Sequence, residues 1–133
     1  MDLSEYHLQD SLCNSAAFLK FLDKYKHYEK INLGWNELTP KGLSAITPKL
    51  SKFKFLRELV LNRNKLGGSV DTLECLVNLL RKTPSIGVVI LKNNNINDSD
   101  ANKIAQTLAN LKGLYKLDLR HNNITSDGAK ALL

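Results

Sequence analysis

The segment LRELVLNRNKL, from Leu56 to Leu66, decides the fold because its pattern occurs four times in the chain. The other copies read YEKINLGWNEL from Tyr28, IGVVILKNNNI from Ile86 and LYKLDLRHNNI from Leu114. Each copy has aliphatic residues at its fourth, sixth and eleventh positions and asparagine at its ninth, and the copies start 28, 30 and 28 residues apart. A period of this length is typical of a solenoid, in which each unit buries its apolar face against its neighbours.

The fourth and sixth positions of each copy predict a short β-strand with one buried face. We expect the strands to be parallel, because a helical crossover returns each unit to the same place. The aliphatic pairs are Ile31/Leu33, Leu59/Leu61, Val89/Leu91 and Leu117/Leu119, and the expected strands lie near residues 30–33, 58–61, 88–91 and 116–119.

The asparagine at the ninth position follows each strand in phase with the aliphatic residues. Its amide can donate to, and accept from, backbone groups of the bend that would otherwise be buried without a partner. We therefore interpret this ladder as structural rather than catalytic, and expect its two inner members to contribute more to stability than the outer two. The ladder consists of Asn36, Asn64, Asn94 and Asn122.

The second half of each unit predicts an amphipathic helix. Helices are expected near residues 15–26, 41–52, 69–82 and 99–111, with the start of another from about residue 126. Pro48 falls inside the first unit's helix and should kink or split it. The expected N-caps are Asn14, Thr39 (with Pro40 in the first turn), Ser69, Asp98 and Ser126.

A full helix in each unit and a period of 28 residues resemble the ribonuclease-inhibitor-like subclass of leucine-rich-repeat proteins. The resemblance covers residues 28–133. The subclass includes the Ran GTPase-activating protein, the receptor ends of NOD-like proteins, tropomodulin-type actin caps and various bacterial effectors. The resemblance implies an α/β solenoid with four short parallel strands on a concave face and helices on the convex face.

One leucine-rich-repeat domain is expected over residues 1–133, with repeats starting at 28, 56, 86 and 114 and the last one incomplete. Residues 1–27 lack the strand pattern, but Phe18 and Leu22 lie one period before Ile46 and Leu50, which predicts a helical N-terminal cap. Since the chain stops within its last helix, we expect either a fragment of a longer protein or an end covered by a partner. The expected state is a monomer, or a weak dimer through that uncapped end.

Composition narrows the class of protein. Apolar residues make up 43% of the chain, which is ordinary for a globular domain. Cys13 and Cys75 flank no cysteine-rich cap of the kind that many extracellular repeat proteins carry, which favours a reducing compartment. The sequence has no long apolar run and no signal peptide. We expect a cytoplasmic location, or delivery into a host cytoplasm if the protein is a bacterial effector, and no membrane partner.

The formal net charge of +6 raises the question of nucleic-acid binding. The lysines gather near predicted helix ends, where cations complement the helix dipole. The sequence shows no basic strip interleaved with aromatic residues and no recognition helix. We therefore expect no nucleic-acid partner.

Catalytic motifs are absent from the sequence. The three histidines, His7, His27 and His121, fall in different units, and the Gly67–Gly68 turn lacks the Lys-Ser/Thr pair of a phosphate loop. We expect no enzyme activity, no cofactor and no metal. Two alternatives stay open, namely a regulatory part of a GTPase-activating or other enzyme, and a structural segment of a larger multidomain protein.

Function is expected on the concave face, at the third, fifth, seventh and eighth positions of each copy. At the fifth, seventh and eighth positions stand a lone tryptophan, two aliphatic residues and three cations, although neutral polar residues would suffice for solubility. Tryptophan and arginine are the residues that most often anchor protein interfaces. We predict that this face binds a protein partner with an acidic surface through Trp35, Val60, Arg63, Ile90, Lys92, Arg120 and His121.

Overall fold

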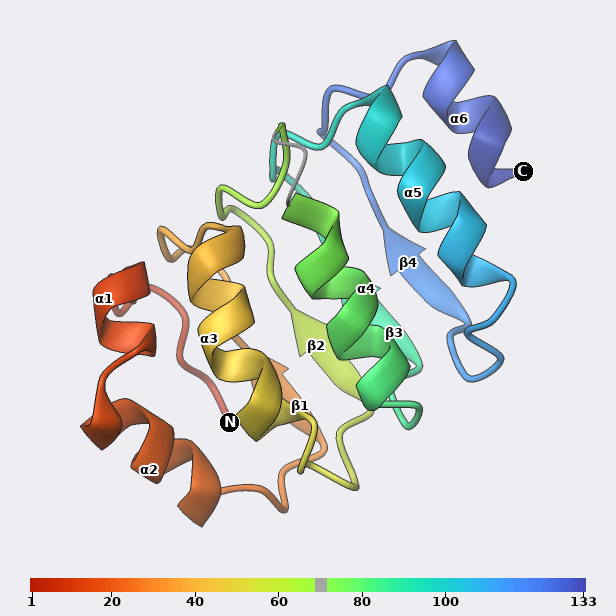
Figure 1. Ribbon diagram of the computed structural model, residues 1–133. Helices are drawn as coiled ribbons and strands as arrows, with labels where there is room; N and C mark the ends of the chain where they lie inside the picture. Colours follow the sequence, from red (N-terminus) through yellow and green to blue (C-terminus); the bar gives the residue numbers. More distant parts are fainter. Residues whose placement is uncertain (69–71) are drawn as a thin grey trace.

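The computed structural model describes residues 1–68 and 72–133, and it shows a parallel sheet covered on one side by helices (Figure 1). The strands are β1 (Lys30–Asn32), β2 (Glu58–Val60), β3 (Val88–Ile90) and β4 (Lys116–Asp118). The helices are α1 (Asp10–Cys13), α2 (Ala16–Lys24), α3 (Pro40–Leu50), α4 (Thr72–Lys82), α5 (Asp98–Leu108) and α6 (Ser126–Leu132). The predicted fold class, an α/β leucine-rich-repeat solenoid, is confirmed.

The four strands pair in the order β1-β2-β3-β4, all parallel and without any offset between units. Each strand lies inside the window that the repeat frame predicts. The third-position residues of the four units are therefore direct neighbours across the sheet, and so are the fifth-position residues. These rows are Lys30–Glu58–Val88–Lys116 and Asn32–Val60–Ile90–Asp118.

The fourth, sixth and eleventh positions form the core between sheet and helices. In the first three units these nine side chains, among them Ile31, Leu61 and Ile96, are at most 2% exposed. Burying one such aliphatic side chain contributes about 1.5–3 kcal/mol, so the frame positions supply a large share of the stability. In the last unit Leu117 and Leu119 are only partly buried.

The N-terminal cap contains the strand half of a further unit, which the side-chain pattern of residues 1–27 did not indicate. The N–H of Leu3 donates to the carbonyl of Asn32 at 2.8 Å, and the N–H of Asn32 donates to the carbonyl of Met1 at 2.9 Å. Asp2 thereby forms a parallel bridge beside β1. Backbone hydrogen bonds, which need no particular side chains, cover this edge of the sheet.

Three helices begin at an N-cap one residue away from the predicted one. An N-cap residue has extended backbone angles while the next residue is already helical, so a shift by one changes which side chain can reach the free N–H groups. The observed caps, with the predicted residues in parentheses, are Ser15 (Asn14), Asn97 (Asp98) and Thr125 (Ser126). Thr39 caps α3 as predicted, and Ser69 lies outside the described residues.

Pro48 does not split α3, so the part of the prediction that concerned a split was wrong. The helix runs without interruption from Pro40 to Leu50, with Pro48 close to its end. Proline at this place removes only the hydrogen bond to the carbonyl of Ser44. Because Ser44 is exposed, water can satisfy that carbonyl.

Two aspartates each accept hydrogen bonds from the N-cap residue of the helix in the following unit. The carboxylate of Asp98 accepts hydrogen bonds from the backbone N–H of Thr125 at 2.7 Å and from its hydroxyl at 2.6 Å. These bonds lower the pKa of Asp98 below its usual value. A Cβ at Gly128, three residues after the cap, would overlap this carboxylate. The cap segment repeats the arrangement with Asp10, Thr39 and Gly42.

Candidate binding surface at the carboxyl end of the sheet

The asparagine ladder closes the backbone of the bend that follows each strand. Asn94 is fully buried, and its amide donates to the carbonyl of Leu61 at 2.8 Å and to that of Leu91 at 3.1 Å. Its side-chain oxygen accepts from the N–H of Leu66 at 3.3 Å. Asn64 makes the corresponding bonds to Leu33, Leu61 and Leu38. Each rung therefore joins its own unit to the preceding one.

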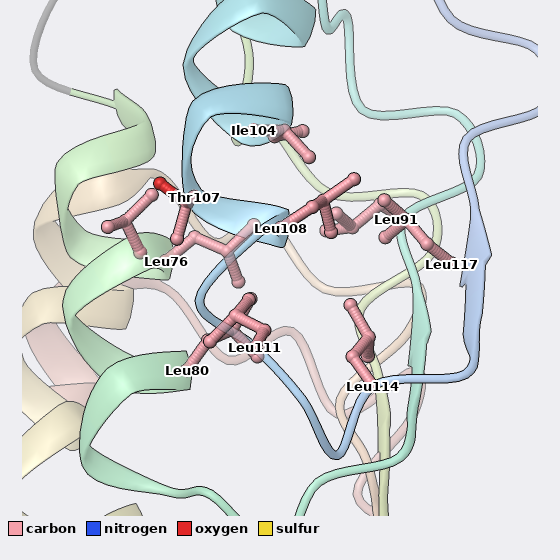
Figure 2. Close-up of a pocket in the computed structure, with 10 residues that line it drawn as sticks. Leu76, Leu80, Leu91, Ile104, Thr107, Leu108, Leu111, Leu114 and Leu117 are labelled. Atoms are coloured by element: carbon pink, nitrogen blue, oxygen red, sulfur yellow. The ribbon is translucent and has the colours of Figure 1, made fainter. Parts of the chain in front are cut away.

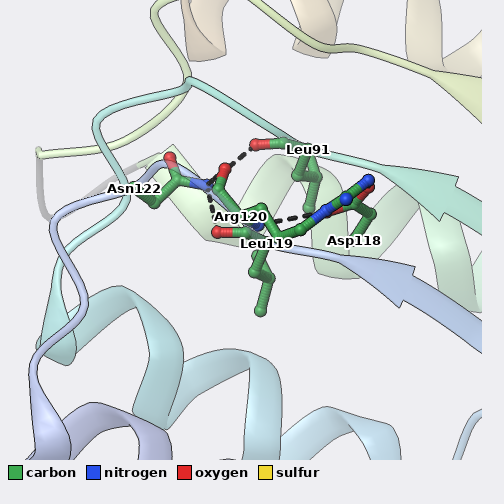
Figure 3. Close-up of polar contacts among 5 residues, drawn as sticks. All are labelled: Leu91, Asp118, Leu119, Arg120 and Asn122. Carbon is green, nitrogen blue, oxygen red and sulfur yellow. Dashed lines mark hydrogen bonds and ion pairs between the residues drawn. The ribbon is translucent and has the colours of Figure 1, made fainter.

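The two outer members of the ladder differ from each other. Asn36 is 4% exposed, like the inner Asn64 at 5%, because the N-terminal segment encloses it. The side chain of Asn36 accepts from the N–H of Leu8 at 2.9 Å and donates to the carbonyl of Leu3 at 2.9 Å. Asn122 is half-buried and donates to the carbonyls of Leu91 and Leu119 (Figure 3).

The eighth position of every unit has a left-handed backbone. The strands end at the fifth position, so the seventh and eighth positions lie in the bend that follows each strand. Non-glycine residues rarely adopt positive φ, yet all four units share it. The four side chains therefore leave the backbone in the same way, in a row along the carboxyl end of the sheet. The residues and φ values are Trp35 (56°), Arg63 (55°), Asn93 (55°) and His121 (56°).

The side chains of Trp35 and Arg63, from neighbouring repeats, stack on each other in this row. The Arg63 guanidinium carbon lies 4.0 Å from the centroid of the Trp35 ring, which is a cation–π contact. The backbones are adjacent because the N–H of Trp35 donates to the carbonyl of Asn62 at 2.9 Å. Trp35 is 49% exposed despite this stacking. The pair presents an apolar surface next to a positive charge.

Arg120 forms an ion pair with Asp118 of its own unit, and this pair was not predicted from the sequence. Two hydrogen bonds join them, from Nε to Oδ1 at 2.9 Å and from Nη2 to Oδ2 at 2.6 Å (Figure 3). The side-chain bonds from Arg120 lower the pKa of Asp118 to about 2. Asp118 is the last residue of β4 and Arg120 follows two residues later in the bend, so their spacing in the sequence itself offered a signal. The pair leaves Arg120 with less unbalanced charge for a partner.

The other predicted site residues lie beside these pairs on or near the open face of the sheet, opposite the helices. Val60 and Ile90 are register neighbours and half-buried, so they offer less apolar surface than an exposed column would. Lys92 is half-buried as well, and His121 is exposed at the end of the row farthest from Trp35. The structure therefore brings together Trp35 with Arg63 and Val60 with Ile90.

The apolar cavity inside the core of the described residues is too small for a ligand. The apolar cavity between α4 and α5 has a volume of about 10 Å³ and is lined mainly by leucines of the core, including Leu80, Leu108 and Leu114 (Figure 2). A single water molecule needs at least about 10–15 Å³, so this void is a local packing gap. Larger hollows are open clefts on the surface.

In the part of the chain that the structure describes, no cluster of three or more histidine, cysteine, aspartate or glutamate residues could hold a metal ion. Cys13 and Cys75 are free and buried, and burial raises the pKa of the Cys13 thiol to about 11. None of the described helices has the length and apolar character needed to cross a bilayer.

Comparisons with known proteins give a family match and two similar proteins. The model of a family described as "Leucine Rich repeat" matches residues 29–46 and 114–133. Protein NLRC5 of Homo sapiens is 30% identical over 126 residues, which cover 78% of this chain and 7% of NLRC5. A crystal structure of an internalin from Listeria monocytogenes is similar with a TM-score of 0.45 and 17% identity, and the match covers 84% of this chain and 34% of that chain.

The repeat frame and the parallel sheet define a leucine-rich-repeat solenoid, and its first and last repeats match the family described as "Leucine Rich repeat". The chain spans only a small part of the length of NLRC5.

Proposed function

We propose that this chain is a non-enzymatic protein-interaction module that binds a protein partner along the carboxyl end and open face of its sheet. The observation that carries the proposal is the stacked pair of Trp35, 49% exposed, and Arg63 at 4.0 Å. Exposing a large aromatic ring costs hydration free energy, and nothing in the repeat frame requires tryptophan at the eighth position. A partner that covers the ring would recover that free energy.

The charges of this surface favour a partner with acidic groups around an apolar contact. Arg63 and Lys92 form no ion pair among the described residues, whereas Arg120 is already paired with Asp118. We therefore place the centre of the interface at Trp35 and Arg63, with Val60, Ile90 and Lys92 beside it. Arg120 and His121 form its rim. Such an interface should associate more slowly as salt increases, because steering depends on the exposed charges.

We also propose that the chain belongs to the ribonuclease-inhibitor-like subclass and that it is located in the cytoplasm. Helices α3, α4 and α5 each have 11 residues, which supports the ribonuclease-inhibitor-like subclass with its full helix in every unit. Free, buried cysteines suit a reducing, cytoplasmic location.

The test is quantitative capture of partners from a lysate of the native source on immobilised protein. Trp35→Ala should remove most of a saturable, salt-sensitive partner that the wild-type chain retains. Tyr6→Ala is the matched control, since Tyr6 is a more exposed aromatic residue (68%) in the N-terminal segment. Equal loss of the partner with both variants, or no loss with Trp35→Ala, would contradict the proposed site.

A further inference from the structure

The opposite edge of the sheet, before the strands, consists of four equivalent turns. In each one the N–H of the fourth residue donates to the carbonyl of the first. The turns are Tyr25–Tyr28 (3.3 Å), Phe53–Leu56 (3.2 Å), Thr83–Ile86 (3.1 Å) and Leu111–Leu114 (3.0 Å). Because the strands pair without offset, the four turn tips lie at one level along one edge of the molecule (Figure 1).

Lysine occupies the same place at the tip of three of these four turns. The second residue of each turn is Lys26, Lys54, Pro84 or Lys112. All three lysines are exposed, and none forms an ion pair among the described residues. A single solvated lysine can occur anywhere on a surface, but three lysines at equivalent positions place three positive charges along the same edge of the molecule.

The basic character of the chain is concentrated along this edge. Residues 23–30, 49–58, 81–88 and 111–116 contain eleven of the 19 basic residues and three of the 13 acidic residues. These segments carry a formal charge of +8, so the remainder of the chain carries −2 and the whole chain +6. Two of the three acids are already paired, Asp23 with Lys49 and Glu58 with Lys30. The edge is therefore strongly positive while the rest of the molecule is close to neutral.

Exposed aromatic side chains stand among these cations. Phe55 follows Lys54 at the tip of its turn and is 58% exposed. Tyr115 is 80% exposed and lies next to Lys116. The ring of Tyr115 rests over Gly87, where a Cβ would collide with it. Phenylalanine has no polar group to satisfy in water, so its exposure at a tip surrounded by lysines favours an interface that is apolar inside and anionic outside.

A cleft lined by both cationic and apolar side chains opens between the third and fourth turns. Its volume is about 320 Å³, and Arg81 and Lys112 stand among its lining with Leu80, Ile86 and Leu114. No acidic side chain lines it. A phosphate bearing an apolar chain matches this combination, because the cations can pair with the phosphate while the leucines contact hydrocarbon.

We propose that this turn edge docks on a lipid bilayer containing anionic lipids, with Phe55 entering the headgroup region and the three tip lysines beside the phosphates. Tips at one level suit a planar surface, whereas single-stranded nucleic acid is bound in a groove that follows its backbone. A bound bilayer would leave the carboxyl end of the sheet, with Trp35 and Arg63, free for a protein. The absence of a spanning segment, from which the sequence analysis expected no membrane partner, does not bear on surface docking.

The test is co-sedimentation of the 133-residue chain with vesicles of phosphatidylcholine containing about 30% phosphatidylserine, at 0.1 M salt. The wild-type chain should bind these vesicles and not vesicles of phosphatidylcholine alone. Lys26→Glu/Lys54→Glu/Lys112→Glu should weaken binding at least about tenfold, since each cation near an anionic surface contributes to attraction. Phe55→Ala should weaken it about threefold or more through loss of the inserted ring.

The matched control reverses three lysines outside this edge, Lys41→Glu/Lys65→Glu/Lys130→Glu, which changes the net charge equally. This variant should retain binding, and circular dichroism should show both triple variants folded. Absence of wild-type binding, equal loss in both triple variants, or an unchanged affinity of Phe55→Ala would overturn the proposal. So would displacement of the vesicles by a single-stranded oligothymidine that binds more tightly, which would assign the edge to nucleic acid.

Discussion

The backbone N–H of Asn94 donates a hydrogen bond of 2.8 Å to the side-chain oxygen of Asn122, one unit further along the solenoid. The same oxygen accepts from the N–H of Ile96 at 3.1 Å. The side chain of Asn122 therefore binds two backbone N–H groups of the preceding unit, one of which belongs to the ladder residue Asn94. Because each bond crosses a unit boundary, loss of one asparagine should weaken the contact between two units rather than one bend alone.

Replacing an enclosed rung should be costly. Asn64→Ala and Asn94→Ala should each lower the free energy of unfolding by about 1–3 kcal/mol, because buried carbonyl and N–H groups lose their partner. Asn36→Ala should cost a similar amount, since Asn36 is buried too, and Asn122→Ala less. Urea denaturation measures these differences. Asn102→Ala, at an exposed position of α5, is the control and should change stability by less than about 0.5 kcal/mol. Losses that are equal and negligible in all four ladder variants would rule out the structural role.

Gly42→Ala should destabilise the protein although it lies in a helix. Alanine in place of glycine usually stabilises a helix by about 1 kcal/mol. Here the new methyl group would overlap the carboxylate of Asp10, which also binds the N-cap Thr39, so we expect a net loss of about 1–2 kcal/mol. In an Asp10→Ala background the same substitution should no longer destabilise. A double-mutant cycle without coupling would show that the two residues do not interact.

The pair of Asp118 and Arg120 should make stability depend on pH in acid. The pKa of Asp118 is lowered to about 2, so its contribution is complete above the unfolded pKa near ~3.9 and is lost as the pH falls toward about 2. The magnitude should be on the order of 1 kcal/mol, because the Arg120 side chain is 74% exposed and solvent screens the pair.

Urea midpoints at about pH 6 and about pH 2 measure this contribution. Asp118→Asn should lower the midpoint at the higher pH and have a much smaller effect at the lower one, where only about half of Asp118 in the folded state is still ionised. Asp127→Asn, whose parent side chain is 83% exposed, should change neither. A deficit of Asp118→Asn that persists undiminished at about pH 2 would mean that its cause is packing rather than charge.

The last unit should exchange its amide hydrogens fastest. Leu117 and Leu119 are partly buried, whereas their counterparts Leu59 and Leu61 are 0% exposed. In a repeat protein, stability is a sum over units and their shared boundaries, so the unit with the least burial opens most easily. Hydrogen–deuterium exchange of the monomeric chain should show least protection beyond about residue 112. Protection there equal to that around β2 would contradict this prediction.

Much of the fold could be predicted because the signal is repeated. The aliphatic positions and the in-phase asparagines place all four strands, since each copy supports the same register. The pairing of Trp35 with Arg63 was accessible as well, because both occupy the eighth position of neighbouring units. The left-handed backbone at that position was not, since tryptophan, arginine and histidine give no local signal for positive φ.

Other features depend on interactions that side-chain patterns do not encode. Met1 to Leu3 join the sheet through backbone groups, which any sequence possesses. Three helix caps were misplaced by one residue because adjacent polar residues, such as Asn97 and Asp98, are both capable of capping. The lysines near predicted helix ends were recognised, but their alignment along one edge was not, because the tip lysines are 28 or more residues apart in the sequence and come to the same edge only once the units stack.

The most direct test of the central claim locates the partner on the surface. A photo-crosslinking amino acid is placed at residue 93, the eighth-position neighbour of Arg63 in the same row, and in a second protein at residue 20, an exposed position on α2. After irradiation with the captured partner, we expect a covalent product from position 93 that Trp35→Ala diminishes, and none from position 20. A product from position 20 alone would place recognition on the helical side and contradict the assignment of the site.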